Sequence, residues 1–414
     1  MLDDPTSPVG YAPITSTQKK SLLAACLGWL FDGLDMHLYG LVAQPMVALL
    51  MSKALTDAEV AQKSSYIQAA FLVGWALGGA IFGRLGDILG RARSLSLTIF
   101  VYACFTGLSF VAHTWWELMI FRFIAALGIG GEWAVGSSLL AETWPSRWRP
   151  WLAAILQTGV NIGVLLACLT AWLLAAEPRY VFLVGVLPAF LVFWIRRAVP
   201  EPEQWTQAAA TKGEQSVKLL FTGPTLRITL LSIVVCACSL TAWWAFMFWI
   251  IKMVRELPEI ASWDLTSRKQ LSSAAFFLLV CVSIGGNFFG GWLAKLAGYR
   301  NAIVVMLIGF FTAMVASFAV PHGHVALMFF TSIVGFFSGV FGLFTMYLPP
   351  LFPTLLRTTG AGFSYNIGRI AAAAGTILFG FYGDVDMRKA LLVNSFLIIP
   401  AAIAAIFLPN THDV

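Results

Sequence analysis

Long apolar stretches run along almost the whole chain, and short polar segments separate them. A helix needs about 20 apolar residues to cross the hydrocarbon core of a lipid bilayer. Stretches of about this length predict twelve spans, at residues 20–50, 64–83, 94–113, 116–141, 151–175, 180–199, 226–251, 271–294, 302–320, 325–348, 358–381 and 389–408. The pattern therefore predicts an all-α membrane protein with twelve transmembrane helices.

The basic residues and the longest polar stretch predict the orientation and the domain boundaries. Of the 26 Lys and Arg residues, 15 fall in loops on the side of the N-terminus and nine in loops on the other side. This excess places both termini in the cytoplasm. The polar stretch after the sixth span predicts a cytoplasmic linker at 200–225 between six-helix bundles at 1–199 and 226–414. We expect a plasma-membrane protein that works as a monomer.

The composition narrows the class of protein. Only 11% of the residues are charged, against about 25% in soluble domains, so the expected surroundings are a lipid bilayer. Basic cytoplasmic loops account for the net charge of +6 without a nucleic acid partner. The six cysteines fall in apolar stretches and lack metal-ligand spacing, and the sequence contains neither a Ser–His–Asp cluster nor a nucleotide-binding loop. We expect neither an enzyme nor a metal or cofactor site.

Two acids, Asp32 and Asp35, interrupt the first predicted span. A carboxylate at the bilayer centre costs roughly 2.5–3.5 kcal/mol, and such residues are functional by default. Their i, i+3 spacing places them on one face of a helix, and Gly33 between them permits a bend or a close approach. We interpret this face as a site that handles a proton or another cation in a transporter. The alternative is a signal-like or interfacial helix.

The two halves of the sequence repeat with an offset of 208 residues. The loop at 83–91 after the second span matches 291–299 after the eighth span. A proline followed four positions later by arginine occurs at 145–149 and again at 353–357. Two independent matches at one offset predict a duplicated six-helix unit, with the two copies related by an axis along the membrane normal.

These motifs resemble those of the major facilitator superfamily of transporters. Segment 83–93 resembles its signature between the second and third spans, although Ile88 stands where an arginine is usual. Segments 141–149 and 199–205 resemble loops of sugar porters and organic acid symporters. Segment 32–35, Asp-Gly-Leu-Asp, resembles the first-span motif of the sialate:proton symporters, which include lactate permeases, and of the aromatic acid:proton symporters.

The resemblance implies proton-coupled import of a small organic anion, either a monocarboxylate or a sialate-like acid, by alternating access. The proton is the coupling ion, and no other cofactor is expected. Three alternatives stay open. One is an aromatic acid:proton symporter, and another is a sugar porter or facilitator without obligatory proton coupling. The third is a transport-derived sensor that binds its ligand without turnover.

Arg369 is the predicted anion-binding residue. At 1.5 Å per residue it lies about 17 Å along its span, and Asp32 and Asp35 lie about 18–23 Å along theirs. All three are therefore near the midplane, where transporters of this architecture bind their substrates. A guanidinium group holds a carboxylate with two parallel hydrogen bonds, and Tyr365 and Asn366 could add more. The alternative is a structural partner for an acid within the bundle.

Further candidates come from the repeat and from the aromatic residues. The offset of 208 aligns Gln157 with Tyr365 and Asn161 with Arg369. Gln157 and Asn161 are therefore expected to face the same cavity from the other half, with packing hydrogen bonds as the equal alternative. Trp243 belongs to an aromatic stripe in the seventh span. This stripe is typical of packing or of an interface belt, and the other interpretation is a wall on which a substrate ring stacks.

Arg122 and Glu132 are assigned to proton coupling together with the two acids of the first span. Ten residues apart in the fourth span, they differ by some 80° around a helix, so no direct contact is expected. Glu132 is placed in the proton route. Arg122 either lies near the cavity or balances Asp32 or Asp35. His37 is a further proton-relay candidate, although it faces away from Asp35.

A cytoplasmic gate is predicted from charged residues near the ends of the second and fourth spans. An aspartate near a helix end can cap the facing helix or pair with a basic residue, and either contact fastens one conformation. The predicted gating residues are Asp87, Arg91, Arg93, Glu142 and Arg149.

Overall fold

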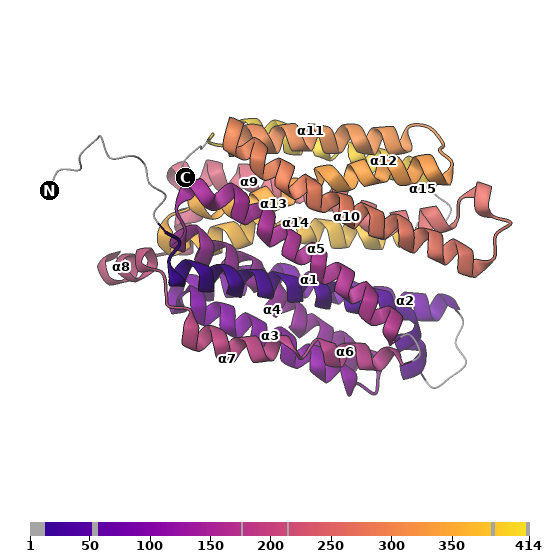
Figure 1. The fold of residues 1–414 in the computed structure, drawn as a ribbon, viewed down its shortest axis with the longest axis horizontal. Helices are drawn as coiled ribbons and strands as arrows, with labels where there is room; N and C mark the ends of the chain where they lie inside the picture. Colours follow the sequence, from indigo (N-terminus) through magenta and orange to yellow (C-terminus); the bar gives the residue numbers. More distant parts are fainter. Residues whose placement is uncertain (1–12, 52–56, 175–176, 213–214, 382–385, 411–414) are drawn as a thin grey trace.

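A computed structural model describes residues 13–51, 57–174, 177–212, 215–381 and 386–410. Within these ranges the chain is built of helices and contains no strand. Figure 1 shows two groups of helices that run side by side along the long axis of the molecule, with α1–α7 in one group and α9–α15 in the other. This is the all-α arrangement that the apolar stretches predict.

The first group contains α1 (Ser16–Leu50), α2 (Asp57–Leu89), α3 (Arg91–Phe110), α4 (Trp115–Thr143), α5 (Arg149–Leu173), α6 (Val181–Val184) and α7 (Pro188–Ala198). The second contains α9 (Gly223–Arg255), α10 (Leu265–Ala297), α11 (Tyr299–Phe318), α12 (His324–Phe337), α13 (Val340–Tyr347), α14 (Arg357–Phe381), α15 (Met387–Ser395) and α16 (Ile398–Ile406). Helix α8 (Glu203–Lys212) lies between the groups in sequence. Short 3-10 helices are Ser146–Trp148, Pro178–Tyr180, Val217–Phe221, Pro258–Ile260, Pro349–Leu351 and Thr354–Leu356.

Each of the twelve predicted spans corresponds to one long helix or to one interrupted pair: α6 with α7, α12 with α13, or α15 with α16. Ten helical segments of the described residues are long and apolar enough to cross a membrane, and α1 and α14 complete the set of twelve. Local sequence explains where helices begin. At α1, the hydroxyl of Thr15 accepts a hydrogen bond from the backbone of Gln18, whose side chain accepts one from Thr15, which is a capping box.

The predicted repeat recurs in the helix boundaries. Helices α2 and α3 meet at Gly90, and α10 and α11 meet at Gly298, 208 positions later. Both glycines have positive φ, 107° and 82°, which side-chain-bearing residues rarely adopt. Helices α5 and α14 each follow a three-residue 3-10 helix and begin at Arg149 and Arg357, again 208 positions apart. The fold is therefore two six-helix repeats.

The most extensive contacts between the repeats are those of α2 with α14 and of α5 with α10. Polar side chains cross the second contact, where Asn161 donates to Ser283 and Asn287 donates to Thr158. Within the first repeat, α2 packs on α4 and α1 on α5. The space between the repeats is thus bordered by helices from both.

One end of the bundle is called the linker end, because α8 lies there (Figure 1). The indole nitrogen of Trp205 in α8 donates to the backbone oxygen of Asp87, so the last turn of α2 lies at this end as well. Helices α7 and α9 end and begin at Ala198 and Gly223, close to the predicted linker at 200–225. The exact domain boundaries and the cytoplasmic side stay predictions.

Candidate functional site

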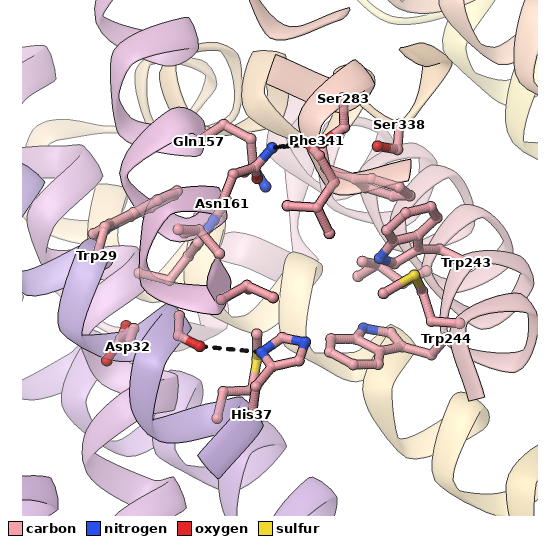
Figure 2. A pocket seen from close by; sticks show the side chains of 18 of the residues that line it. Trp29, Asp32, His37, Gln157, Asn161, Trp243, Trp244, Ser283, Ser338 and Phe341 are labelled. Atoms are coloured by element: carbon pink, nitrogen blue, oxygen red, sulfur yellow. Dashed lines mark hydrogen bonds between the residues drawn. The ribbon is translucent and has the colours of Figure 1, made fainter. Parts of the chain in front are cut away.

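A cavity of about 110 Å³ lies between the repeats. Figure 2 shows Asp32 and Trp29 on one side of it, Trp243 and Trp244 on another, and Gln157, Asn161, Ser283 and Ser338 grouped at a third. Its residues come from α1, α2, α4 and α5 of the first repeat and from α9, α10, α14 and the α12–α13 region of the second. The cavity therefore lies where the repeats face each other.

Arg369 on α14 supplies a buried positive charge to this cavity and is only 3% exposed. Its guanidinium carbon lies 3.6 Å from the ring centre of Trp75 and 4.8 Å from that of Tyr365, which is a double cation–π arrangement. Nη1 donates to the side-chain oxygen of Asn366, and Nε has no hydrogen-bond partner. Among the described residues, no carboxylate lies within ion-pair distance of Arg369.

Aromatic rings form much of the remaining wall. Trp133 stacks on Tyr365 with a centroid separation of 3.9 Å and an interplanar angle of 8°. Trp75 meets Trp244 edge to face at 5.4 Å. Trp243 lies in the wall of the cavity, and its ring centre is 5.7 Å from that of Phe341. It therefore packs against a neighbouring ring, and stacking with a substrate ring stays a prediction.

Asp32 lines the cavity, and its carboxyl group lies within hydrogen-bonding reach of the Glu132 carboxyl group behind it. Gly28 makes room for Glu132, because a Cβ atom at this position would overlap the Glu132 side chain. Among the described residues, no donor reaches either carboxyl oxygen of Glu132 or Oδ1 of Asp32. Two carboxylates this close repel each other when both are ionised. A proton shared between them would remove this repulsion and supply the missing hydrogen-bond donor.

Asp35 belongs to a different site. Both of its carboxyl oxygens accept from Arg122 at 3.1 Å, and Arg122 also donates to Thr106. Asp35 and Arg122 are fully buried, and neither lines the cavity. Asp32 and Asp35 therefore meet different partners, and a shared role in proton handling stays a prediction. The 60° between positions i and i+3 is enough to direct them to different neighbours.

The amide pair of α5 lies where the repeat alignment placed it. Gln157 and Asn161 both line the cavity, together with Tyr365 and Arg369. Asn161 donates to Ser283 and to the backbone oxygen of Val280, so it also joins α5 to α10. Both sequence interpretations of Asn161, cavity and packing, therefore hold.

At the linker end, Asp87 joins the two repeats. Its carboxylate accepts from the backbone nitrogens of Thr358 and Thr359 at 3.2 and 2.8 Å and from the Thr359 hydroxyl at 2.6 Å. It therefore caps the first turn of α14 from the other repeat, where the helix dipole favours a negative charge. Arg91 donates to Asp87 at 2.9 Å and to Glu142 at 2.8 Å.

Two further contacts complete this cluster, which we name the linker-end latch: Asp87, Arg91, Glu142, Thr354, Arg357, Thr358 and Thr359. Arg91 donates to the backbone oxygen of Thr354, and Arg357 donates to Glu142 at 3.1 Å. Both of these hydrogen bonds, Arg91 to Thr354 and Arg357 to Glu142, connect the first repeat with the second. The latch closes the linker end between the repeats.

Two predicted gating residues play smaller parts in the latch. The Arg93 side chain is exposed, and its backbone nitrogen donates to the Glu201 carboxylate. The first turn of α3 turns this side chain outward, away from the contacts between the repeats, and a gating role for it stays a prediction. Arg149 is buried beside the latch and donates to the backbone oxygen of Ala141 rather than to Glu142.

The repeat offset could have found the cavity residues that sequence reasoning missed. Positions 208 apart line the cavity in six pairs: Asp32 with Leu240, Met36 with Trp244, Trp75 with Ser283, Trp133 with Phe341, Gln157 with Tyr365, and Asn161 with Arg369. Only the last two pairs were considered from sequence. Glu201, whose carboxylate accepts from the backbone nitrogens of Ala92 and Arg93, has no comparable signal beyond its place in the 199–205 motif.

Two known transporters are similar to this chain over almost its whole length. A sialic acid transporter of Escherichia coli is 28% identical over 420 residues, which cover 98% of this chain and 96% of the relative. A probable 4-methylmuconolactone transporter of Cupriavidus pinatubonensis is 29% identical over 412 residues, or 96% and 92% of the two chains.

A solved structure shows the same fold. The proton:xylose symporter XylE, bound to 6-bromo-6-deoxy-D-glucose, matches with a TM-score of 0.75 at 17% identity over 96% of this chain and 97% of its own. The family profile of the Major Facilitator Superfamily matches residues 25–363. These relatives are transporters rather than enzymes, and this chain belongs to the Major Facilitator Superfamily.

Proposed function

We propose that this transporter imports a small organic carboxylate together with protons. Relatives that carry the names of a sialic acid transporter and a 4-methylmuconolactone transporter support an organic substrate. The charge and the shape of the cavity support the narrower proposal.

The observation that carries the proposal is the state of Arg369. A guanidinium group that is 97% buried near the middle of a membrane protein is costly unless an anion compensates it. Asn366, Trp75 and Tyr365 hold the group in place but bring no negative charge. Asp32 is the acid that acts electrostatically on it, across the cavity. A substrate carboxylate is therefore the partner that this arginine accommodates.

The walls favour a substrate with a ring. Trp29, Trp75, Trp133, Trp243 and Trp244 border the cavity, and aromatic walls bind flat apolar surfaces through offset or edge-to-face contacts. The second candidate, an aromatic acid:proton symporter, is therefore favoured over a sialate-like specificity.

The Asp32–Glu132 pair is the proposed proton carrier. A proton shared by the two carboxyl groups leaves one negative charge near Arg369. In this proposal a second proton neutralises the pair, which frees Arg369 for the substrate carboxylate. When that proton is lost, the Asp32–Glu132 pair again carries a negative charge and competes with the substrate carboxylate for Arg369. This competition favours release of the substrate. The Asp35–Arg122 pair holds α1 against α4 throughout.

The transport cycle follows from the linker-end latch. We assign the linker end to the cytoplasm, so the latched form is the one that binds from outside. Opening the latch and closing the opposite end would change access to the cavity from one side of the plasma membrane to the other. A single chain is the proposed working unit. No cofactor other than the proton enters this cycle.

The test is uptake into proteoliposomes. Labelled benzoate, lactate, N-acetylneuraminate and xylose are supplied with and without an inward proton gradient. We expect benzoate to accumulate only with the gradient. Arg369→Lys keeps the charge but loses the planar pair of donors, so its benzoate uptake should fall at least tenfold. Gradient-independent uptake of xylose would support a facilitator instead, and normal benzoate uptake by Arg369→Lys would make the arginine structural.

A further inference from the structure

A polar atom of the cavity has no role in this cycle: Nε2 of His37. His37 lies on α1, about 7.5 Å beyond the level of Asp32 at 1.5 Å per residue. Its ring borders the cavity, and Figure 2 shows its second nitrogen turned toward the cavity and toward Trp244. The centre of the Phe276 ring lies 6.2 Å from the centre of the imidazole ring. The imidazole thus borders the cavity beside aromatic rings.

The hydrogen bond of the other nitrogen decides what Nε2 can do. Nδ1 lies 3.1 Å from the backbone oxygen of Gly33. A carbonyl oxygen only accepts, so Nδ1 must carry the hydrogen and donate it. In the neutral imidazole Nε2 is then an acceptor with a free lone pair. Among the described residues no group donates to it, and it is not sealed from the cavity.

Several other polar groups of the cavity are engaged by partners or carry charge, whereas the amide of Gln157 has no hydrogen-bond partner among the described residues. The hydroxyls of Ser283 and Ser338 donate to backbone oxygens of their own helices, and the amide of Asn161 donates to Ser283. Arg369 attracts an anion, and Asp32 has Glu132 beside it. His37 therefore provides a neutral acceptor that is separate from the charged groups of the cavity.

We propose that His37 is a specificity-determining residue that accepts a hydrogen bond from a donor group on the substrate, at the end opposite its carboxylate. The inference rests on the proposed function, because Arg369 fixes the carboxylate end. It narrows the substrate to ring-bearing acids with a hydroxyl or N–H substituent on the far side of the ring. An acid without this donor leaves Nε2 without a partner when the cavity loses its water, and sites built for a donor discriminate against such analogues.

The test is calorimetric binding to the purified full chain with ring acids matched in size. The probes are 3- and 4-hydroxybenzoate, the corresponding 3- and 4-fluorobenzoates, and 4-hydroxybenzamide. Fluorine occupies nearly the space of a hydroxyl but donates nothing. We expect one hydroxybenzoate to bind up to about tenfold more tightly than its fluoro partner. His37→Phe and His37→Met should remove this preference, whereas His322→Phe, outside the cavity, should retain it.

The outcomes separate the inference from the proposed function. Equal binding of the hydroxy and fluoro acids by the parent protein would overturn the role of His37 and leave the carboxylate proposal intact. The same is true of a preference that persists in both His37 variants. Binding of 4-hydroxybenzamide as tight as that of the acids, or no binding of any acid, would overturn the carboxylate proposal and the inference with it.

Discussion

The two buried arginines Arg122 and Arg369 differ in the side chains that they meet. Arg122 meets Asp35 through two parallel hydrogen bonds and has lost all contact with solvent. Among the described residues, Arg369 meets the rings of Trp75 and Tyr365 and the amide of Asn366, without an ion pair. The same residue type thus has a structural role in the first repeat and a proposed binding role in the second. The two roles differ because the protein places a carboxylate, Asp35, in contact with Arg122 but places none in contact with Arg369 among the described residues.

This difference leads to opposite expectations for the two acids of α1. Asp35→Asn leaves Arg122 buried without its partner, which costs roughly 3–5 kcal/mol for such pairs, so the variant should unfold at lower temperature. Asp32→Asn and Glu132→Gln each imitate a protonated acid. They should keep stability and substrate exchange while losing accumulation driven by a proton gradient. Thermal unfolding in detergent and proteoliposome uptake measure the two effects.

The control is the double variant Asp35→Asn with Arg122→Gln, in which neither charge is left alone. It should recover part of the stability lost in Asp35→Asn. Undiminished proton-driven accumulation in both Asp32→Asn and Glu132→Gln would contradict the assignment of the proton to this pair.

Sequence reasoning placed most of the site residues but could not pair them. Depth along a span follows from the rise per residue, so Asp32, Asp35 and Arg369 were predicted at one level. Which neighbour each one meets depends on how α1, α4 and α14 are rotated against one another. The sequence leaves that rotation undefined, because apolar residues face lipid as well as the core: Phe100 is 52% exposed, whereas Ile99 beside it is fully buried.

Between helices, Asp87 acts as a cap for a helix of the other repeat. Asp87→Asn keeps an oxygen acceptor but removes the charge, and hydrogen bonds to charged groups contribute roughly 1.5–3 kcal/mol. The equilibrium between conformations that are closed and open at the linker end should therefore shift by about tenfold or more toward the open ones. Spin labels at Arg93 and Arg300, in a cysteine-free background, would show this as a larger population of long distances in pulsed electron resonance.

The matched control is Glu203→Gln, which removes one negative charge from an exposed position in α8 at the same end. Its distance distribution should resemble that of the parent protein. Identical distributions in Asp87→Asn and the parent would show that the latch does not depend on this carboxylate.

Close packing of α2 on α4 depends on Gly130. A Cβ atom here would overlap the backbone oxygen of Trp75 and approach the backbone nitrogen of Gly79 at 2.9 Å. Gly130→Val should therefore destabilise the protein by about 1–3 kcal/mol. Gly40→Val makes the same change in α1, where a Cβ atom would meet nothing within 4 Å. Thermal unfolding of the two purified variants should separate them clearly, and equal melting temperatures would show that α2 and α4 can move apart at no cost.

At the scale of the whole molecule, hydropathy and repetition were sufficient to predict the fold. Twelve apolar stretches define twelve spans because each must cross the same thickness of hydrocarbon. The offset of 208 then predicts that the halves are alike, and the pairs Gly90 with Gly298 and Arg149 with Arg357 follow it. The interruptions within the sixth, tenth and twelfth spans were not predicted, because a short break leaves the mean hydropathy of a stretch almost unchanged.

Alternating access requires the repeats to separate at the linker end, and a covalent bond between them can test this directly. A Cβ atom built on Gly86 of α2 would lie 3.5 Å from the Cβ atom of Thr358 in α14. Disulfides join Cβ atoms about 3.5–4.5 Å apart. We expect Gly86→Cys with Thr358→Cys, in a background without the six native cysteines, to form a bond on oxidation. Uptake should then stop, and dithiothreitol should restore it.

The bond should block transport without blocking binding, because it fastens the latch and leaves the cavity between α1, α5, α9 and α14 unchanged. Oxidised protein should therefore bind benzoate in detergent about as tightly as reduced protein does. Each single-cysteine variant, treated with the same oxidant, should keep its uptake. If the cross-linked protein still accumulates substrate, the linker end does not open during transport, and the cavity must exchange its contents by another route. Loss of both binding and uptake on oxidation would show instead that the latch and the cavity are one rigid unit.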